Sequence, residues 1–202
     1  MSAPVVLAKP KAQKVSRSNR GSLPGEDSDE WRTPLPVLRA IERHLGVHFI
    51  ADMAADRHNS VCPIYFTRED DTLAMNAGSI RDRIRDSLPA VDPQKHALFC
   101  NPPYKATGLA AWIQKGAAVS KWIDLPWVFL LPASRTEQPW MHLRPAHEFN
   151  LTLVKHRIAY IRPDGTPGTR PNHPSMVMAF PGENRRILGG RFSLLNREKE
   201  GT

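Results

Sequence analysis

The chain has 202 residues, 41% of them hydrophobic, which is enough for one domain with a substantial core. A formal net charge of +8 favours a polyanionic partner such as nucleic acid, although solvated surface charge gives the same total. Apolar runs of about five residues are far too short for a transmembrane helix, and two cysteines cannot form a disulfide framework. We therefore expect no membrane association and a reducing, cytoplasmic location.

Both ends of the chain read as tails around one domain at 30–182. Residues 1–29 carry basic residues first and an acidic cluster last, and they lack aromatic residues, so we expect disorder. The basic half either contacts phosphate non-specifically or is simply solvated. From residue 183 to 202 the chain is polar and rich in arginine, and we expect a second tail.

Order is expected to begin at Trp31. Thr33 followed by Pro34 predicts a helix N-cap with proline at the first helical position, and Gly46 predicts the end of that helix. A strand over 47–50 then leads to Asp52, which small residues follow. An acid there binds a ligand hydroxyl or balances a cation, or else it only caps the next turn.

The remaining pattern alternates strands and helices. Strands are predicted over 64–66, 97–100, 127–131, 149–154, 157–161 and 176–180, and helices within 76–95, over 107–123 and over 136–146. This order predicts an α/β fold with a mainly parallel sheet, helices on both faces and an antiparallel edge. A long loop at 162–174 carries Arg162, Arg170 and Asn172, which suit contact with a nucleic-acid backbone.

The most informative stretch is Asn101-Pro102-Pro103-Tyr104, which directly follows the apolar run 97–100. Ligands in such sheets lie beyond the carboxyl ends of the strands. The prolines stiffen the loop and remove donors, so the Asn101 and Pro102 carbonyls can accept both hydrogens of an exocyclic nucleobase amine. Tyr104 can stack on the base. An ordinary turn with a surface tyrosine would use the same four residues.

Six segments together resemble the phage-type, Dam-like DNA adenine methyltransferase family; they are 31–34, 49–55, 70–73, 101–104, 156–160 and 174–180. The resemblance covers most of the chain, from about residue 30 to 182. It implies a Rossmann-like methyltransferase fold. It also implies transfer of a methyl group from S-adenosylmethionine to the exocyclic amine (N-6) of a flipped adenine in double-stranded DNA, inside a bacterial host cell.

Carried over residue by residue, the resemblance implies a complete site. The catalytic residues would be Asn101, Pro102, Pro103 and Tyr104, and the cofactor would contact Trp31, Thr33, Pro34, Asp52, Ala54, Asp71 and Asn101. DNA is expected to contact Lys105, Arg157, Arg162, Arg170 and Asn172. We expect no bound metal, and either a monomer or a weak dimer.

Two departures and three alternatives accompany this prediction. The turn after the first strand, 51–55, has no glycine, and the four-residue motif begins with Asn instead of Asp. The same chemistry could act on cytosine, an RNA adenine or a protein glutamine, or the chain could be an inactive DNA-binding protein on the same fold. A zinc site from the pairs His58–Cys62 and His96–Cys100 is the third alternative, but Cys100 lies in an apolar strand.

Overall fold

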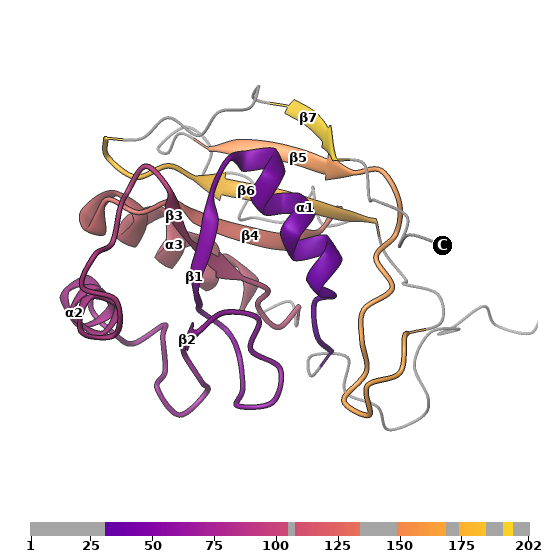
Figure 1. Ribbon diagram of the computed structural model, residues 1–202, viewed down its shortest axis with the longest axis horizontal. Coiled ribbons are helices and arrows are strands. Elements are labelled where there is room, and N and C mark those ends of the chain that lie inside the picture. The colour runs from indigo at the N-terminus through magenta and orange to yellow at the C-terminus, as the bar shows by residue number, and fades with distance from the viewer. Residues whose placement is uncertain (1–30, 105–107, 134–148, 169–173, 185–191, 196–202) are drawn as a thin grey trace, which may run out of the picture.

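The computed structural model describes residues 31–104, 108–133, 149–168, 174–184 and 192–195. These residues form one mixed sheet with helices on both of its faces (Figure 1). In chain order the elements are α1 (Leu35–Leu45), β1 (His48–Asp52), β2 (Ile64–Tyr65), α2 (Ala77–Ser87), β3 (His96–Cys100), α3 (Leu109–Ile123), β4 (Trp127–Pro132), β5 (Asn150–Val154), β6 (Ser175–Phe180) and β7 (Phe192–Leu195). None of the helices in these segments has the length and apolar character needed to cross a bilayer.

The strand order is β2-β1-β3-β4-β6-β5-β7. β1 is parallel to β2 and to β3, β3 is parallel to β4, and β5 is parallel to β7. β6 is antiparallel to both of its neighbours, β4 and β5. The predicted α/β class is therefore confirmed, but the antiparallel pairing lies inside the sheet and not at its edge.

The two faces of β4 show why the sheet needs helices on both sides. Trp127, Phe129 and Leu131 are buried in a cluster with residues of α2 and α3. Val128 and Leu130 point the other way, into a cluster with residues of α1. Since successive side chains of a strand face opposite sides, a continuous apolar run requires two covered faces.

α1 confirms one predicted boundary and corrects the other. Gly46 ends the helix in the left-handed region, with φ 64°, as its residue type suggests. The N-cap is Pro34 and not Thr33. The reason is that backbone hydrogen bonds between Arg32 and Ile161, at 2.7 and 3.0 Å, keep the chain before Pro34 extended.

Two further predictions need correction. Residues 157–161 do not form a strand of the sheet; only Ile161 makes isolated bridges, to Arg32 and to Pro167. The backbone hydrogen-bonding groups of Ile161 are used by these bridges, so no ladder extends along the segment. Residues 192–195, inside the stretch predicted to be a polar tail, pair with β5 as β7. The helix predicted over 136–146 lies outside the described residues.

Candidate active site

The carboxyl ends of four parallel strands meet at one edge of the sheet, and the predicted site residues follow them. Asp52, the last residue of β1, pairs with Tyr65 of β2 and Phe99 of β3. Just beyond, the Met53 amide donates to the Phe99 carbonyl at 2.8 Å. Asp52 and the loop that begins at Asn101 therefore leave adjacent strands at the same edge.

Tyr104 ties the loop after β3 to the end of β4. Its hydroxyl donates to the Asn101 side-chain oxygen at 2.6 Å and lies 3.2 Å from the Leu130 carbonyl oxygen. Asn101 and Tyr104 are partly exposed, Pro103 is exposed and Pro102 is buried. The Asn101 carboxamide is thus fixed from one side and is not sealed in the core.

A chain of hydroxyl groups continues from Tyr104 into the protein. The Tyr104 and Tyr160 hydroxyl oxygens are 3.2 Å apart, and Ser175 Oγ lies 3.4 Å from the Tyr160 hydroxyl. Desolvation by burial raises the pKa of Tyr160 above its usual value, so this phenol stays protonated at neutral pH. No role was predicted for Tyr160 from the sequence, although it closes one of the six segments of the resemblance.

Asp52 is a buried carboxylate, with only 4% of its surface exposed. It accepts hydrogen bonds from the amides of Ala54, at 3.4 Å, and Val61, at 3.3 Å, so it does cap the following turn. Burial raises the pKa of Asp52 to about 7; the two amide bonds oppose this shift, and the charge of Asp56 adds to it. A carboxylate in this setting would gain from a cationic or hydroxyl-bearing ligand.

The segment from Trp31 to Pro34, before α1, packs against the residues around Tyr160. A side chain at Gly168 would collide with the Trp31 ring, at 2.8 Å, and with the Tyr160 carbonyl, at 2.9 Å, so this close approach requires glycine. The Arg162 guanidinium lies 5.5 Å from the centre of the Trp31 ring. The buried Trp31 Nε1 and Thr33 Oγ1 have no hydrogen-bond partner in the part of the chain that the structure describes.

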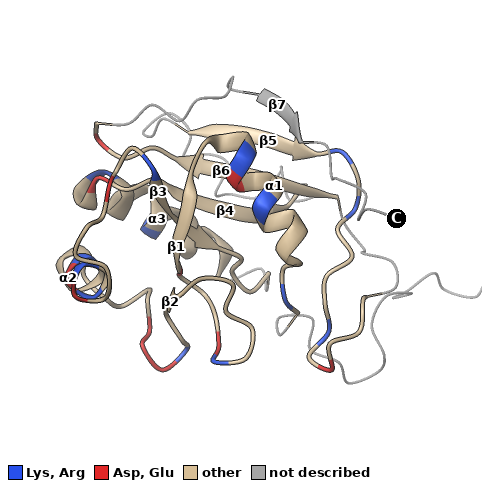
Figure 2. Cartoon of the chain, viewed as in Figure 1, with Lys and Arg blue, Asp and Glu red and all other residues tan. Residues whose placement is uncertain are grey.

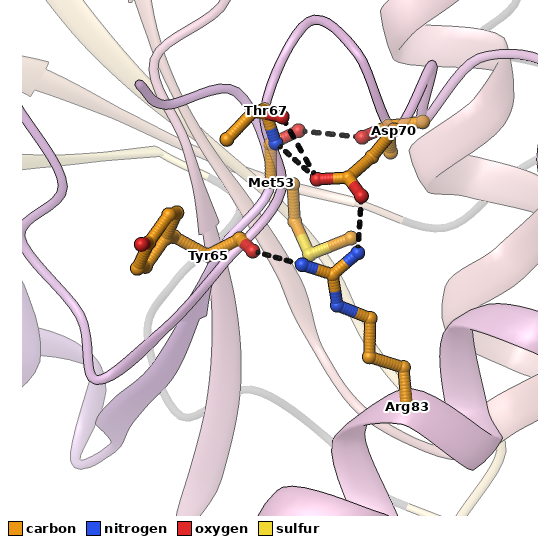
Figure 3. A network of polar contacts seen from close by, with 6 residues as sticks. Met53, Tyr65, Thr67, Asp70 and Arg83 are labelled. Atoms are coloured by element: carbon orange, nitrogen blue, oxygen red, sulfur yellow. Dashed lines mark hydrogen bonds and ion pairs between the residues drawn. The ribbon is translucent and has the colours of Figure 1, made fainter. Parts of the chain in front are cut away.

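Asp70 organises the loop after β2 (Figure 3). Asp70 pairs with Arg83 of α2 at 2.6 Å and accepts from the Thr67 amide at 2.7 Å and the Thr67 hydroxyl at 3.0 Å. The bond from Arg83 is the main reason that the pKa of Asp70 is lowered. Asp71 is exposed, with a left-handed backbone (φ 47°), and its contact with the cofactor stays a prediction.

Two further hydrogen bonds join this loop to the strands. Arg83 donates a second bond, to the Tyr65 carbonyl at 2.9 Å (Figure 3). Thr72 donates to the Met53 carbonyl at 3.1 Å. A cavity of about 670 Å³ opens beside the loop; residues 56–58, Thr67, Glu69 and Asp70 contribute to its lining, and residues 101–104 do not. The site edge thus has a braced loop on each side of Asp52.

The residues predicted to contact DNA are only partly described. Arg157 is exposed, and Arg162 donates to the Pro167 carbonyl at 2.9 Å on the segment that packs against Trp31. Lys105, Arg170 and Asn172 lie outside the described residues. Basic and acidic residues are interspersed over the helices and loops that are described (Figure 2).

The described contacts of Cys62, His96 and Cys100, from the two pairs considered as a zinc site, are packing and turn contacts. Cys62 and Cys100 are buried free thiols, and His96 Nδ1 accepts from the Asp92 amide at 2.9 Å. Within the described ranges, no group of three or more His, Cys, Asp or Glu side chains is arranged to hold a metal ion. These contacts are those of packing and turn formation.

Comparison with known proteins gives two matches. Residues 20–200 match the family described as DNA N-6-adenine-methyltransferase (Dam). A similar relative, "Putative methyltransferase YfdM" of Escherichia coli (strain K12), is 34% identical over 79 residues, which are 39% of this chain and 75% of that protein. The family match extends beyond residues 30–182, into both segments that were predicted to be tails.

Proposed function

Because the chain belongs to the DNA N-6-adenine-methyltransferase (Dam) family, we propose that it transfers a methyl group from S-adenosylmethionine to the N-6 amine of a flipped adenine in double-stranded DNA. Family and relative make it a methyltransferase; the donor, the duplex substrate and the flipped base are what this proposal adds. The observation that carries it is the partly exposed residue Asn101, whose side-chain oxygen accepts a hydrogen bond from Tyr104 at the carboxyl end of β3.

Asn101 would grip the target amine. Its side-chain oxygen has two lone pairs, and the Tyr104 hydroxyl uses one of them, so one remains for an N–H of the amine. Pro102 has no backbone N–H and adds a carbonyl acceptor for the second hydrogen. Two acceptors on one NH₂ group draw its lone pair away from the ring and make the nitrogen more nucleophilic.

Tyr104 would contact the flipped base while it stays anchored. Its hydroxyl is held at Asn101 and Leu130, and the side chain remains partly exposed. An aromatic face of this kind supports stacking worth about 1–3 kcal/mol per base. The base would therefore meet the stacking surface and the amine acceptor on one short loop.

The residues at the edge of the sheet fit S-adenosylmethionine. When bound, it supplies a methyl group already activated by a positively charged sulfur. Asp52 is a buried acid, and the charge of the neighbouring acid Asp56 acts against its ionisation, so it suits a cationic or hydroxyl group of the cofactor. Trp31 Nε1 and Thr33 Oγ1 are buried donors that suit a carboxylate. Pro34, Ala54 and Asp71 complete the proposed set.

Substitution of Asn101 by Ala tests the proposal. We expect transfer of labelled methyl from S-adenosylmethionine to duplex DNA to fall at least about 100-fold, as when a positioned transition-state partner is lost. Cofactor affinity, measured by calorimetry, should change less than about twofold because the acceptor serves the amine. Asn184→Ala is a matched control, since Asn184 is exposed and bonds to Asp124 at the opposite end of the sheet.

Near-normal turnover by Asn101→Ala would remove Asn101 from the mechanism. DNA binding by the wild type without cofactor binding would favour the inactive DNA-binding alternative. Methylation of cytosine, RNA or protein glutamine with unmodified DNA adenine would move the same chemistry to a different substrate.

A further inference from the structure

The Tyr104 hydroxyl has more neighbours than it has protons. In the part of the chain that the structure describes, it contacts Asn101 Oδ1 at 2.6 Å, the Leu130 carbonyl at 3.2 Å and the Tyr160 hydroxyl at 3.2 Å. A phenol carries one hydrogen to donate. The shortest of the three contacts is to Asn101, so that is where the proton of Tyr104 is directed.

It follows that Tyr160 is the donor in the contact between the two phenols. The Tyr104 hydroxyl donates its hydrogen to Asn101, and the Tyr160 hydroxyl is within hydrogen-bond distance of the lone pairs of the Tyr104 oxygen. Ser175 Oγ, 3.4 Å from the Tyr160 hydroxyl, adds a third hydroxyl group to this series. Hydroxyl groups that donate in series polarise one another, so the bond from Tyr160 strengthens the bond that Tyr104 donates to Asn101.

This series of hydroxyl groups favours one of the two orientations of the Asn101 carboxamide over the other. With the side-chain oxygen towards Tyr104, the phenol donates to it, as observed. Rotation by half a turn would place the amide NH₂ there instead, and that group would need a lone pair of the Tyr104 oxygen. A bond donated by Tyr160 polarises the Tyr104 hydroxyl, which becomes a stronger donor and a weaker acceptor, and this disfavours the rotated form. The rotated form would present a donor to the N–H groups of the target amine.

Given the adenine methyltransferase function proposed above, on which this role rests, we propose that Tyr160 is a positioning residue that acts through Tyr104 to hold the Asn101 oxygen towards the target amine. Tyr160 does not itself touch the base. Its contribution is to the orientation of an acceptor, so it affects the chemical step and not the binding of DNA or cofactor.

The test is a pair of Tyr→Phe substitutions, alone and combined. Tyr160→Phe keeps the ring and removes the hydroxyl, and we expect kcat to fall about fivefold, the factor for one net hydrogen bond. KM for DNA and affinity for S-adenosylmethionine should stay within about twofold. In the Tyr104→Phe background the same change should have no further effect on kcat, because the relay to Asn101 is already broken.

Tyr65→Phe is the matched control, because the chain has three tyrosines and the Tyr65 ring points away from the polar network of its loop (Figure 3). It should keep full kcat. An unchanged kcat in Tyr160→Phe, or an equal loss in the presence and absence of the Tyr104 hydroxyl, would overturn the positioning role.

A measurement without turnover separates this role from the proposed activity. The side-chain NH₂ signals of Asn101 in ¹⁵N-edited NMR spectra should shift in Tyr160→Phe and Tyr104→Phe, and stay in place in Tyr65→Phe. Unmoved Asn101 signals in Tyr160→Phe would overturn the relay even in an active enzyme. Shifted signals in a protein that methylates no adenine would retain the relay and reject the function. If Tyr160→Phe does not fold, Ser175→Ala replaces it and should shift the same signals less; no shift there overturns the relay.

Discussion

Replacement of Asp52 by Asn should change how stability depends on pH. The carboxyl is almost fully buried, and its pKa in the folded protein is about 7, against 3.8 in the unfolded chain. The folded protein therefore keeps a proton that the unfolded chain loses above about pH 4. The contribution of Asp52 to the free energy of unfolding therefore decreases as the pH rises from about 4 to 7 and then levels off.

The size of this effect follows from the two pKa values. A difference of about three pKa units corresponds to about 4 kcal/mol at pH 8. Asn cannot ionise, so the variant lacks this loss. In Asn an NH₂ group stands in place of one of the two oxygens that accept from the Ala54 and Val61 amides. One of these two hydrogen bonds is therefore lost, which costs about 1 kcal/mol. Asp52→Asn should thus be less stable than the wild type at pH 4, and more stable by about 3 kcal/mol at pH 8.

Urea unfolding followed by tryptophan fluorescence at several pH values between 4 and 8 measures this difference. Subtraction of the wild-type curve from the variant curve removes the contribution of every other titrating group. Asp164→Asn is the control, because the bonds to Thr166 lower the pKa of Asp164, and the pH-dependent part of its contribution lies below about pH 4. Between pH 4 and 8 its curve should therefore run parallel to that of the wild type. Parallel curves for the wild type and Asp52→Asn would refute the reasoning.

Two other substitutions test the packing that positions the site. Gly116→Ala would place a methyl group 2.5 Å from the fully buried Phe129 ring, and should lower the free energy of unfolding in urea by about 1–3 kcal/mol; an unchanged stability would mean that α3 can move away from β4. Arg83→Ala removes both bonds that Arg83 donates, to Asp70 and to the Tyr65 carbonyl (2.6 and 2.9 Å), and should speed hydrogen exchange at the Thr67 amide at least about fivefold; equal exchange rates would contradict the bracing role of Arg83.

The sequence predicted those parts of the fold that depend on local pattern. The apolar run 127–131 required two covered faces, and β4 has them. Gly46 ends α1 because few other residues adopt its left-handed backbone readily. The position of Asn101 after a buried strand also follows from local pattern, because an apolar run that stops at a polar residue and two prolines predicts a strand end.

Features that depend on distant partners were not predictable in this way. Residues 157–161 have the composition of a strand, but their hydrogen bonds go to Arg32, 129 positions earlier, and to the turn that follows. The role of Asp70 in its loop depends on the ion pair with Arg83, which lies on α2. The contact of Tyr160 with Tyr104 arises only when β6 and its neighbours bring the two segments together.

The most direct test of the central claim is the identity of the methylated group. Duplex DNA is incubated with the protein and S-adenosylmethionine carrying a labelled methyl group, digested to nucleosides and analysed by mass spectrometry. We predict label in N6-methyladenine with the wild type and at least about 100-fold less with Asn101→Ala. Label in another nucleoside, or equal N6-methyladenine from both proteins, would contradict an adenine amine held by Asn101.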